Sequence, residues 1–298
     1  MAERLQQIAG QLRPARESAT QQDSKDPSRI DGYVVLVTGG AQGIGRATAN
    51  LLATKGAKIV IADVSEEKSS EAVRDLRAHG YEAVSIVGDA LEDGFAEKTV
   101  KYALDALGKV NCLINNAGFC YDAAIHKMDD EKFDVIMKIH NYVPFRMIRA
   151  LSAHWMDPAN RDMPKVIVNV SSTSGLHGQM GQINYATAKM GVVGLTKTVA
   201  SEWARYGVRC NAVAYGWMDT RLTRPPTGEE TVATGGKEIV LGISAKAKKF
   251  RDLSEIPLGR CGTVDDAAGV MLFLAKSRCD ALDEVGDQRL SEIIARKM

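Results

Sequence analysis

A short apolar run that leads straight into a glycine-rich turn constrains the fold more than any other feature of this chain. Residues 33–37 (YVVLV) are apolar and β-branched, which is typical of a strand buried in a parallel sheet. The turn TGGAQGIG at residues 38–45 follows, and a helical pattern then continues through Ala57. Glycines let a backbone approach a pyrophosphate, and the first N–H groups of a helix attract anions. The three segments together predict a nucleotide-phosphate site.

The same alternation continues through the first half of the chain. Strand patterns at 58–62, 83–87 and 111–114 alternate with helical patterns at 65–79 and 95–107. This order predicts an α/β fold, a Rossmann-like doubly wound parallel sheet in three layers. Ligands of such sheets bind beyond the carboxyl ends of the strands. The polar or glycine residues expected there are Gly39, Asp63, Asp89, Asn116 and Ser172.

Asp63 indicates which dinucleotide the site accepts. It ends the second strand pattern, about 20 residues past the glycine turn, where a carboxylate suits the adenosine ribose hydroxyls. A carboxylate there would repel the extra phosphate of NADP, and Gln42 in the turn brings no neutralising cation. Both observations favour NAD over NADP. Asp63 also suits the N-cap of the next helix, and the two roles can coexist.

Tyr185 and Lys189 suggest proton transfer. Four residues apart on a helical pattern, they lie on one face, one turn apart. We expect the ammonium to favour the phenolate and to lower the pKa of the tyrosine toward the working range. The hydroxyl of Ser172 could bind the substrate oxygen that the tyrosine protonates. The alternative is a tyrosine packed under the stem of a surface lysine.

With these residues in place, the chain resembles a classical short-chain dehydrogenase/reductase, and most of all the 3-oxoacyl-thioester reductase-like branch. The resemblance covers about residues 30–275. It is carried by the glycine turn with Gly39, Gly43 and Gly45, and by Asn115-Asn116-Ala117-Gly118, Ser172, Tyr185-x-x-x-Lys189, Asn211–Ala214 and Ile256–Arg260.

The resemblance implies a role for each matching residue. Tyr185 would be the acid/base, Lys189 would bind the nicotinamide ribose, and Ser172 would orient the substrate oxygen. The expected cofactor-binding residues are Gly39, Gly43, Ile44 and Gly45 at the pyrophosphate, Asp63 at the ribose, Asp89 and Ala90 at the adenine, Asn116 and Gly118 near the sheet switch point, and Thr220 at the nicotinamide carboxamide, together with Tyr185 and Lys189. The resemblance also implies a homodimer or homotetramer.

Two departures lie within the expected catalytic region. Twenty-five residues after Asn115 the family usually has a catalytic asparagine, but this chain has His140, with Asn141 next to it. Either the imidazole supports the proton relay, since it can donate and accept, or the helix is locally shifted. A histidine merely packed in the helix is the third alternative. Tyr215-Gly216 replaces the family's Pro-Gly, where the tyrosine either reshapes the cofactor wall or only widens the turn.

The sequence predicts a single NAD-binding domain at residues 30–298. One segment before this domain and two segments within it differ from the rest. Residues 1–29 suggest a flexible or loosely docked extension, with a weak alternative of an organellar presequence. Residues 221–256 are either a lid over the substrate or an ordinary surface insertion, and Trp217, Met218 and Leu222 beside them suggest an apolar substrate portion. Residues 277–298 are expected to form an atypical helical tail in place of the family's last strand.

Composition excludes several other classes of protein. A net charge of +1 gives no footprint for nucleic acid or an anionic membrane, and no apolar run is long enough to span a bilayer. The spacing of the five cysteines does not match a set of metal ligands, so no metal site is expected. Their odd number indicates reduced thiols and a cytoplasmic location.

The sequence therefore predicts an oxidoreductase that transfers hydride between NAD and a secondary alcohol or ketone. Two alternatives stay open. One is an NADPH-dependent 3-oxoacyl-thioester reductase, and the other is a catalytically silent NAD-binding subunit, which the altered C-terminus and His140 motivate. The sequence does not name the substrate, because this scaffold handles many alcohols.

Overall fold

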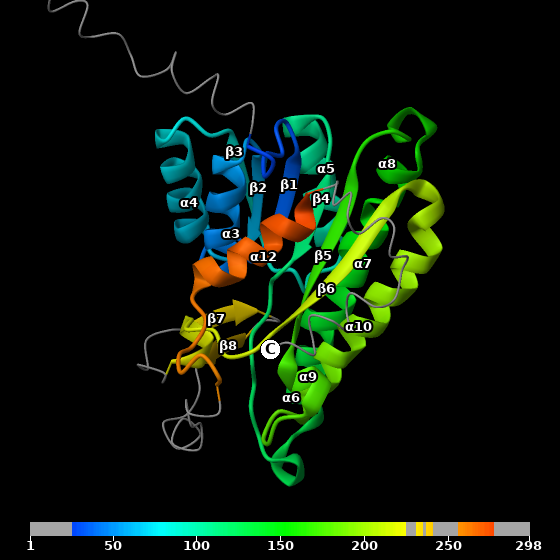
Figure 1. Cartoon of the computed structure of the whole chain (residues 1–298). Coiled ribbons are helices and arrows are strands. Elements are labelled where there is room, and N and C mark those ends of the chain that lie inside the picture. Colours follow the sequence, from blue (N-terminus) through cyan, green and yellow to red (C-terminus); the bar gives the residue numbers. More distant parts are fainter. Residues whose placement is uncertain (1–25, 225–230, 235–236, 241–255, 277–298) are drawn as a thin grey trace, which may run out of the picture.

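A parallel sheet of six strands forms the centre of the molecule (Figure 1). The computed structural model describes residues 26–224, 231–234, 237–240 and 256–276. The strands run in the order β3-β2-β1-β4-β5-β6, so the chain builds outward from β1 first in one direction and then in the other. Their bounds are β1 Val34–Thr38, β2 Lys58–Asp63, β3 Ala83–Val87, β4 Cys112–Asn115, β5 Lys165–Ser172 and β6 Val208–Tyr215.

Helices cover both faces of this sheet, which gives the three layers that the sequence predicts. One face packs against α3 (Gly43–Thr54), α4 (Glu66–Ala78) and α12 (Val264–Ala275), and the other against α5 (Phe95–Leu107), α7 (Val143–Ala150) and α10 (Ile183–Trp203). Alternate residues of β1 point to opposite faces, so Val35 and Val37 enter the first core while Val34 and Leu36 enter the second. The fold class is therefore confirmed.

Shorter helical turns connect these layers. They are η2 (Ile125–Lys127), α6 (Asp130–Met137), the π-helical turn η3 (Lys138–Tyr142), α8 (Ser152–Met156), η4 (Pro158–Asn160), α9 (Thr173–His177), η5 (Ala204–Tyr206) and η6 (Arg221–Thr223).

The predicted elements agree with the structure to within a few residues. Strand β3 and helix α5 have the predicted bounds, and α4 is flanked by Ser65 and His79, the two ends of the predicted pattern, as its caps. Helix α3 ends at Thr54 instead of continuing through Ala57, because Gly56 adopts a φ of 92°, a left-handed conformation that stops a helix.

The segments that set this chain apart are only partly described. Residues 26–30 dock on the end of α3, where Asp26 pairs with Lys55 at 2.9 Å and Ile30 is buried. Between 221 and 256 the chain forms η6 and an antiparallel hairpin of β7 (Thr231–Thr234) and β8 (Lys237–Val240). The expectations for residues 1–25, for most of the segment 221–256 and for the tail at 277–298 concern residues outside the described part of the chain. Within the described part, β6 is an edge of the sheet.

None of the helices that the structure describes has both the length and the apolar composition that a membrane crossing requires.

Candidate active site

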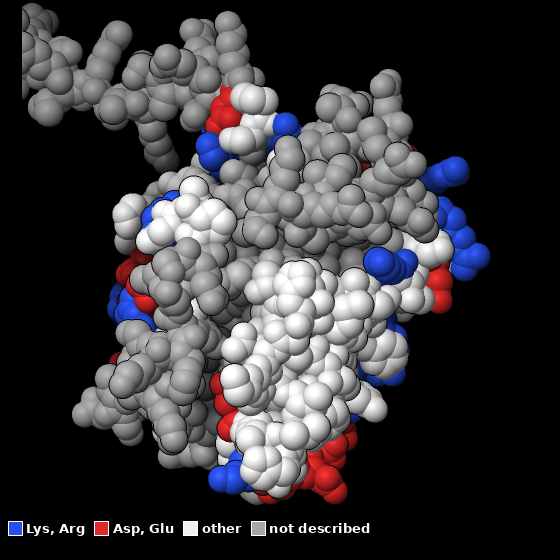
Figure 2. Space-filling model, turned by 60° about the horizontal axis from the view of Figure 1, so that its bottom comes forward, with Lys and Arg blue, Asp and Glu red and all other residues white. Residues whose placement is uncertain are grey.

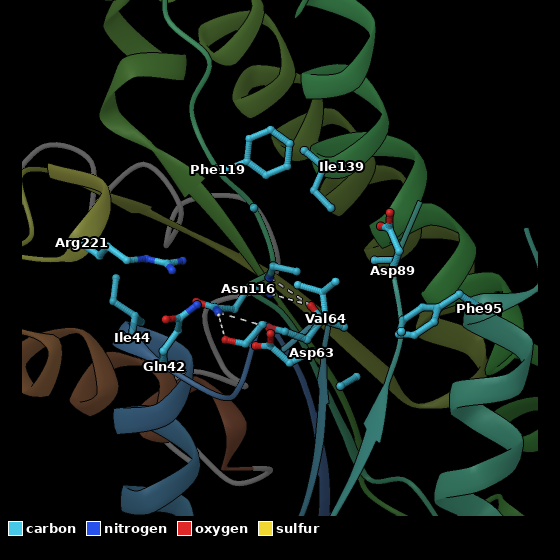
Figure 3. A pocket seen from close by; sticks show the side chains of 18 of the residues that line it. Gln42, Ile44, Asp63, Val64, Asp89, Phe95, Asn116, Phe119, Ile139 and Arg221 are labelled. Carbon is cyan, nitrogen blue, oxygen red and sulfur yellow. Dashed lines mark hydrogen bonds between the residues drawn. The ribbon is translucent and has the colours of Figure 1, made fainter. Parts of the chain in front are cut away.

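A cavity opens at the carboxyl ends of β1, β2, β3 and β4, where the sequence predicts the ligand (Figure 3). Of the predicted cofactor-binding residues, most line it directly: Gly39, Gly43, Ile44, Asp63, Asp89, Ala90, Asn116, Gly118 and Thr220. Residues from four strands and the turn after β6 thus meet around one space. Gly45, Tyr185 and Lys189, which were also predicted to bind the cofactor, are not among the residues that line it.

Close packing explains why the turn needs its glycines. A Cβ on Gly45 would lie 2.1 Å from the carbonyl oxygen of Gly39 and 2.6 Å from the amide of Asn116. The same amide donates to the carbonyls of Thr38 at 3.2 Å and Gly39 at 3.0 Å. The turn is therefore fixed against the loop after β4, and no larger residue fits at Gly45.

The N-terminus of α3 faces the cavity without a cap. Among the residues that the structure describes, no side chain caps this helix, and its first turn holds no acidic residue. By contrast, Ser65 caps α4, Asp129 caps α6 and Thr263 caps α12 through their side chains. The unpaired N–H groups and the helix dipole make this end suitable for a phosphate.

Asp63 is buried, with 7% of its surface exposed, and its carboxylate connects the glycine turn to the segment before α4. Its two oxygens accept from the backbone N–H groups of Ala41 and Ser65, both at 3.1 Å. A carboxylate has lone pairs left for ribose hydroxyls after these two bonds. Ser65, and not Asp63, is the side chain that caps α4, and Lys68 of α4 donates to Gln42 of the turn at 2.8 Å. Sequence reasoning missed this cation near Gln42.

The predicted catalytic residues meet at one point beside this cavity. Ser172 ends β5, while Tyr185 and Lys189 lie on α10, and the hydroxyl of Ser172 lies near enough to Tyr185 to lower the pKa of its phenol. The ammonium of Lys189 lies 5.4 Å from the centre of the Tyr185 ring and donates to the carbonyl of Val170 at 2.7 Å. Lys189 is 3% exposed, so it is not a surface lysine lying over a tyrosine.

The expected lowering of the pKa of Tyr185 is not what the structure shows. Burial raises the pKa of this phenol well above its usual value, and Cys120 and Asp122 raise it further, while the hydrogen bond from Ser172 opposes them. Burial also lowers the pKa of Lys189 to about 8. The sequence pattern shows the pair of side chains but not how far the fold removes both from water. In the structure, Tyr185 is therefore held in its protonated form near neutral pH.

His140 lies against Tyr185 inside the π-helical turn η3. The two rings meet edge to face, with centroids 5.1 Å apart, and a Cβ on Gly118 would lie 2.1 Å from the imidazole. The Nε2 atom of His140 donates to the carbonyl of Phe119 at 2.8 Å, which leaves Nδ1 as an acceptor. That buried Nδ1 has no hydrogen-bond partner within the described structure. Burial lowers the pKa of His140 well below its usual value, so the ring is neutral.

The π-helical turn also decides where Asn141 points. Its amide donates to the carbonyl of Ala188 on α10 at 2.9 Å, whereas His140 binds the carbonyl of Phe119. The local shift of the helix and the placement of His140 beside Tyr185 are thus features of the same turn, and the histidine takes the inward position.

Three neighbouring residues correct or extend the sequence interpretation. Tyr215 does not line the cavity, because its hydroxyl donates to Ala267 at 2.8 Å and joins β6 to α12. Met218 is buried in the core against Gly262 and so does not face a substrate. Cys120, two residues after Gly118, hydrogen-bonds to Tyr185, a contact that no motif in the sequence signals.

Comparison with known proteins agrees with this geometry. Residues 33–230 match the family model described as short chain dehydrogenase. A 3-oxoacyl-acyl-carrier-protein reductase of Thermotoga maritima is 33% identical over 83% of this chain and 92% of its own length. A peroxisomal multifunctional enzyme type 2 of Mus musculus is 36% identical over 69% of this chain and 28% of its length. A hydroxy(phenyl)methylsuccinyl-CoA dehydrogenase subunit of Thauera aromatica is 33% identical over 83% and 90%.

Proposed function

The chain belongs to the short-chain dehydrogenase family, and from that premise we propose that it transfers hydride between NAD and a secondary alcohol or ketone with an apolar portion. Membership makes it an NAD(P)-dependent oxidoreductase of hydroxyl and keto groups, in the branch related to 3-oxoacyl reductases. The preference for NAD and the nature of the substrate are the proposed part.

The observation that carries the proposal is the meeting of Ser172, Tyr185 and Lys189 beside the cavity at the carboxyl ends of the strands. When bound, the nicotinamide supplies or accepts the hydride. Ser172 binds the substrate oxygen, and Tyr185, protonated near neutral pH, donates its proton to that oxygen during reduction. In the other direction the tyrosinate takes the proton from the alcohol. Lys189 holds the ribose beside the tyrosine.

Two features of the cofactor end support NAD. The buried carboxylate of Asp63 would accept from both ribose hydroxyls, whereas a phosphate at the same place would meet a like charge. Asp89 adds a second carboxylate to the cavity wall. Lys68, bonded to Gln42, is the feature that opposes this preference.

An apolar substrate portion is supported by the surface beside Tyr185. Ala123 pairs with Gln182, which brings the loop after β4 beside the loop before α10. Met180 and Ile125 on these loops are 90% and 72% exposed. Figure 2 shows that the face of the molecule at the end with α6 and α9 presents mostly uncharged residues, with both acidic and basic side chains at its margin.

A second candidate is the reduction of 3-oxoacyl thioesters with NADPH. Two relatives are named for substrates carried on acyl-carrier protein or CoA, and the exposed apolar side chains beside Tyr185 would suit an acyl chain. Lys68 near Gln42 favours the phosphorylated cofactor.

Assembly and compartment complete the proposal. Phe145 on α7 and Met190 on α10 are 44% and 51% exposed, which supports a homodimer or homotetramer built through these helices. The four cysteines in the described part of the chain are free thiols, which supports a cytoplasmic location.

Steady-state kinetics with both cofactors tests the proposal. Secondary alcohols, steroids and 3-hydroxyacyl thioesters would be screened with NAD and NADP, and turnover followed by the absorbance of the reduced nicotinamide. We expect oxidation of at least one alcohol with a higher kcat/KM for NAD. A preference for NADP would favour the second candidate. Binding of NADH without turnover of any substrate would instead support a silent subunit.

A further inference from the structure

Arg221 is the only cationic residue among those that line the cavity in the described structure. It begins η6, directly after Thr220. Figure 3 shows its side chain reaching into the cavity from the side of Gln42 and Ile44, while Asp89 and Phe95 lie on the opposite side. The cation therefore lies at the end of the cavity where α3 begins, away from Asp89.

The other charged residues that line the cavity in the described part of the chain are negative, so a cation there would offset them. Two carboxylates, Asp63 and Asp89, line the cavity, and a dinucleotide would add its anionic pyrophosphate. The glycine turn offers only N–H dipoles to that group. Arg46, the basic residue in the first turn of α3, does not line the cavity, and its guanidinium donates to Asp75 at 2.8 Å.

The turn that carries Arg221 is fixed from both sides. The hydroxyl of Thr223 accepts from the N–H of Thr220 at 3.0 Å and donates to Met218 at 2.6 Å. The N–H of Asp219 donates to the carbonyl of Gly262 at 2.7 Å, and so joins η6 to the segment before α12.

Helix α12 in turn packs along α3, which begins at the glycine turn (Figure 1). Arg221 and the phosphate-facing end of α3 therefore share one framework. The backbone of this turn therefore loses little conformational freedom when a ligand binds.

We propose that Arg221 binds the pyrophosphate of the dinucleotide, opposite the N-terminus of α3. A guanidinium can donate two parallel N–H bonds to phosphate oxygens and carries a full positive charge, which the N–H groups of the turn lack. The chain after β6 thereby becomes part of the cofactor site and covers the phosphates once they are bound. This inference rests on the proposed function, since it requires a dinucleotide in the cavity.

Calorimetric titration with ADP-ribose and with adenosine separates a phosphate contact from a general loss of binding. We expect Arg221→Ala to weaken ADP-ribose about tenfold, and adenosine by less than about twofold, because only the first ligand carries phosphates. Arg224→Ala is the matched control, since Arg224 is exposed and pairs with Asp219 at 3.0 Å. It should change neither affinity.

Equal ADP-ribose affinity in wild type and Arg221→Ala, or an equal loss for adenosine, would overturn the inference while leaving the proposed function intact. If Arg221→Ala does not fold, Arg221→Lys decides, because it keeps the charge but loses the paired donors. It should bind ADP-ribose about threefold more weakly, and an unchanged affinity would count against the inference. Wild-type protein that binds neither ADP-ribose nor NADH would remove the proposed function itself.

Discussion

The nucleotide end and the proton-transfer end of this site are built from different materials. At the nucleotide end, the cavity is shaped mainly by the backbone. Glycines allow close approach, the N-terminus of α3 is uncapped by a described side chain, and Asn116 donates to main-chain carbonyls. At the other end, buried side chains predominate, and His140 Nδ1 and Asn141 Oδ1 have no partner within the described structure.

This difference indicates which substitutions each end of the site tolerates. A backbone site depends on shape, so an added carbon atom damages it while an altered charge nearby matters less. A site of buried polar side chains depends on protonation states that desolvation sets, so pH and single polar atoms matter most. The predictions below test that contrast.

Removal of one oxygen atom at the proton-transfer end should have the largest effect. Tyr185→Phe keeps the ring that packs against His140 but lacks the acid, so we expect kcat to fall about 10³-fold. Binding of NADH, followed by its fluorescence, should change less than about threefold, because the nucleotide end is untouched. Turnover at the wild-type rate would contradict the assignment of Tyr185.

Addition of one carbon atom at the nucleotide end should have the next largest effect. In Gly45→Ala the new Cβ would meet the Gly39 carbonyl at 2.1 Å, so the turn must move, and we expect NADH to bind about a hundredfold more weakly. Gly194→Ala is the matched control, because Gly194 is an exposed glycine of α10 with open space around its Cβ position. That variant should bind NADH normally and unfold at a slightly higher temperature.

The pH dependence of turnover tests the protonation states directly. Because the pKa of Tyr185 is raised, the tyrosinate fraction grows about tenfold per pH unit, and alcohol oxidation should rise accordingly. The rise should flatten above about pH 8, where Lys189 loses its proton. Ketone reduction, which uses the protonated tyrosine, should stay level from pH 6 to about 8.

Cys120→Ser is a second test of this pH profile. The thiol of Cys120 contributes to the raised pKa of Tyr185, so its replacement should shift the oxidation limb to lower pH. An unshifted limb would mean that a group other than Tyr185 sets the profile.

A change of charge at the nucleotide end should have a smaller effect on the choice of cofactor. Asp63→Ala removes the acceptor for the ribose hydroxyls and the repulsion of a phosphate, so the kcat/KM preference for NAD over NADP should shrink about tenfold. Asp63→Asn keeps one oxygen for the N–H of Ala41 or Ser65, and so separates the loss of charge from the loss of the turn's support. A wild-type preference for NADP would refute the argument from Asp63.

The same contrast explains what the sequence could predict. The glycine turn, the strand ends and the spacing of Tyr185 and Lys189 are local patterns. The glycine turn and the strand ends lie at the cavity as expected, and Tyr185 and Lys189 lie on one helix, although neither lines the cavity. The position of Cys120 against Tyr185 depends on how the loop after β4 packs against α10. Arg221 enters the cavity because η6 is joined to the segment before α12, a contact far along the chain.

The π-helical turn is a second feature that local patterns did not settle. It adds one residue to a turn at 138–142, and this determines that His140 faces inward while Asn141 faces α10. The pKa of Tyr185 was predicted with the wrong sign for a related reason. A sequence shows a neighbouring cation but not the burial that outweighs it.

The smallest effect that we predict concerns stability, and it bears on what the proton-transfer end requires of the fold. Burial lowers the pKa of Lys189 in the folded protein to about 8, from the 10.5 that is usual for a lysine in the unfolded chain. Below pH 8 the ammonium is charged in both states, and the folded state carries the full desolvation cost. Between pH 8 and about 10.5 the folded protein has lost this proton while the unfolded chain keeps it, so the wild type gains stability as pH rises.

Lys189→Met should therefore abolish most activity and yet unfold in denaturant with a free energy about 1 kcal/mol higher at pH 7. The gain is limited because the carbonyl of Val170 loses its donor. The gap to the wild type should narrow by pH 10. A variant less stable than the wild type at pH 7 would mean that Lys189 supports the fold, and that the cost of placing a charged amine in this core has been offset by the bond to Val170.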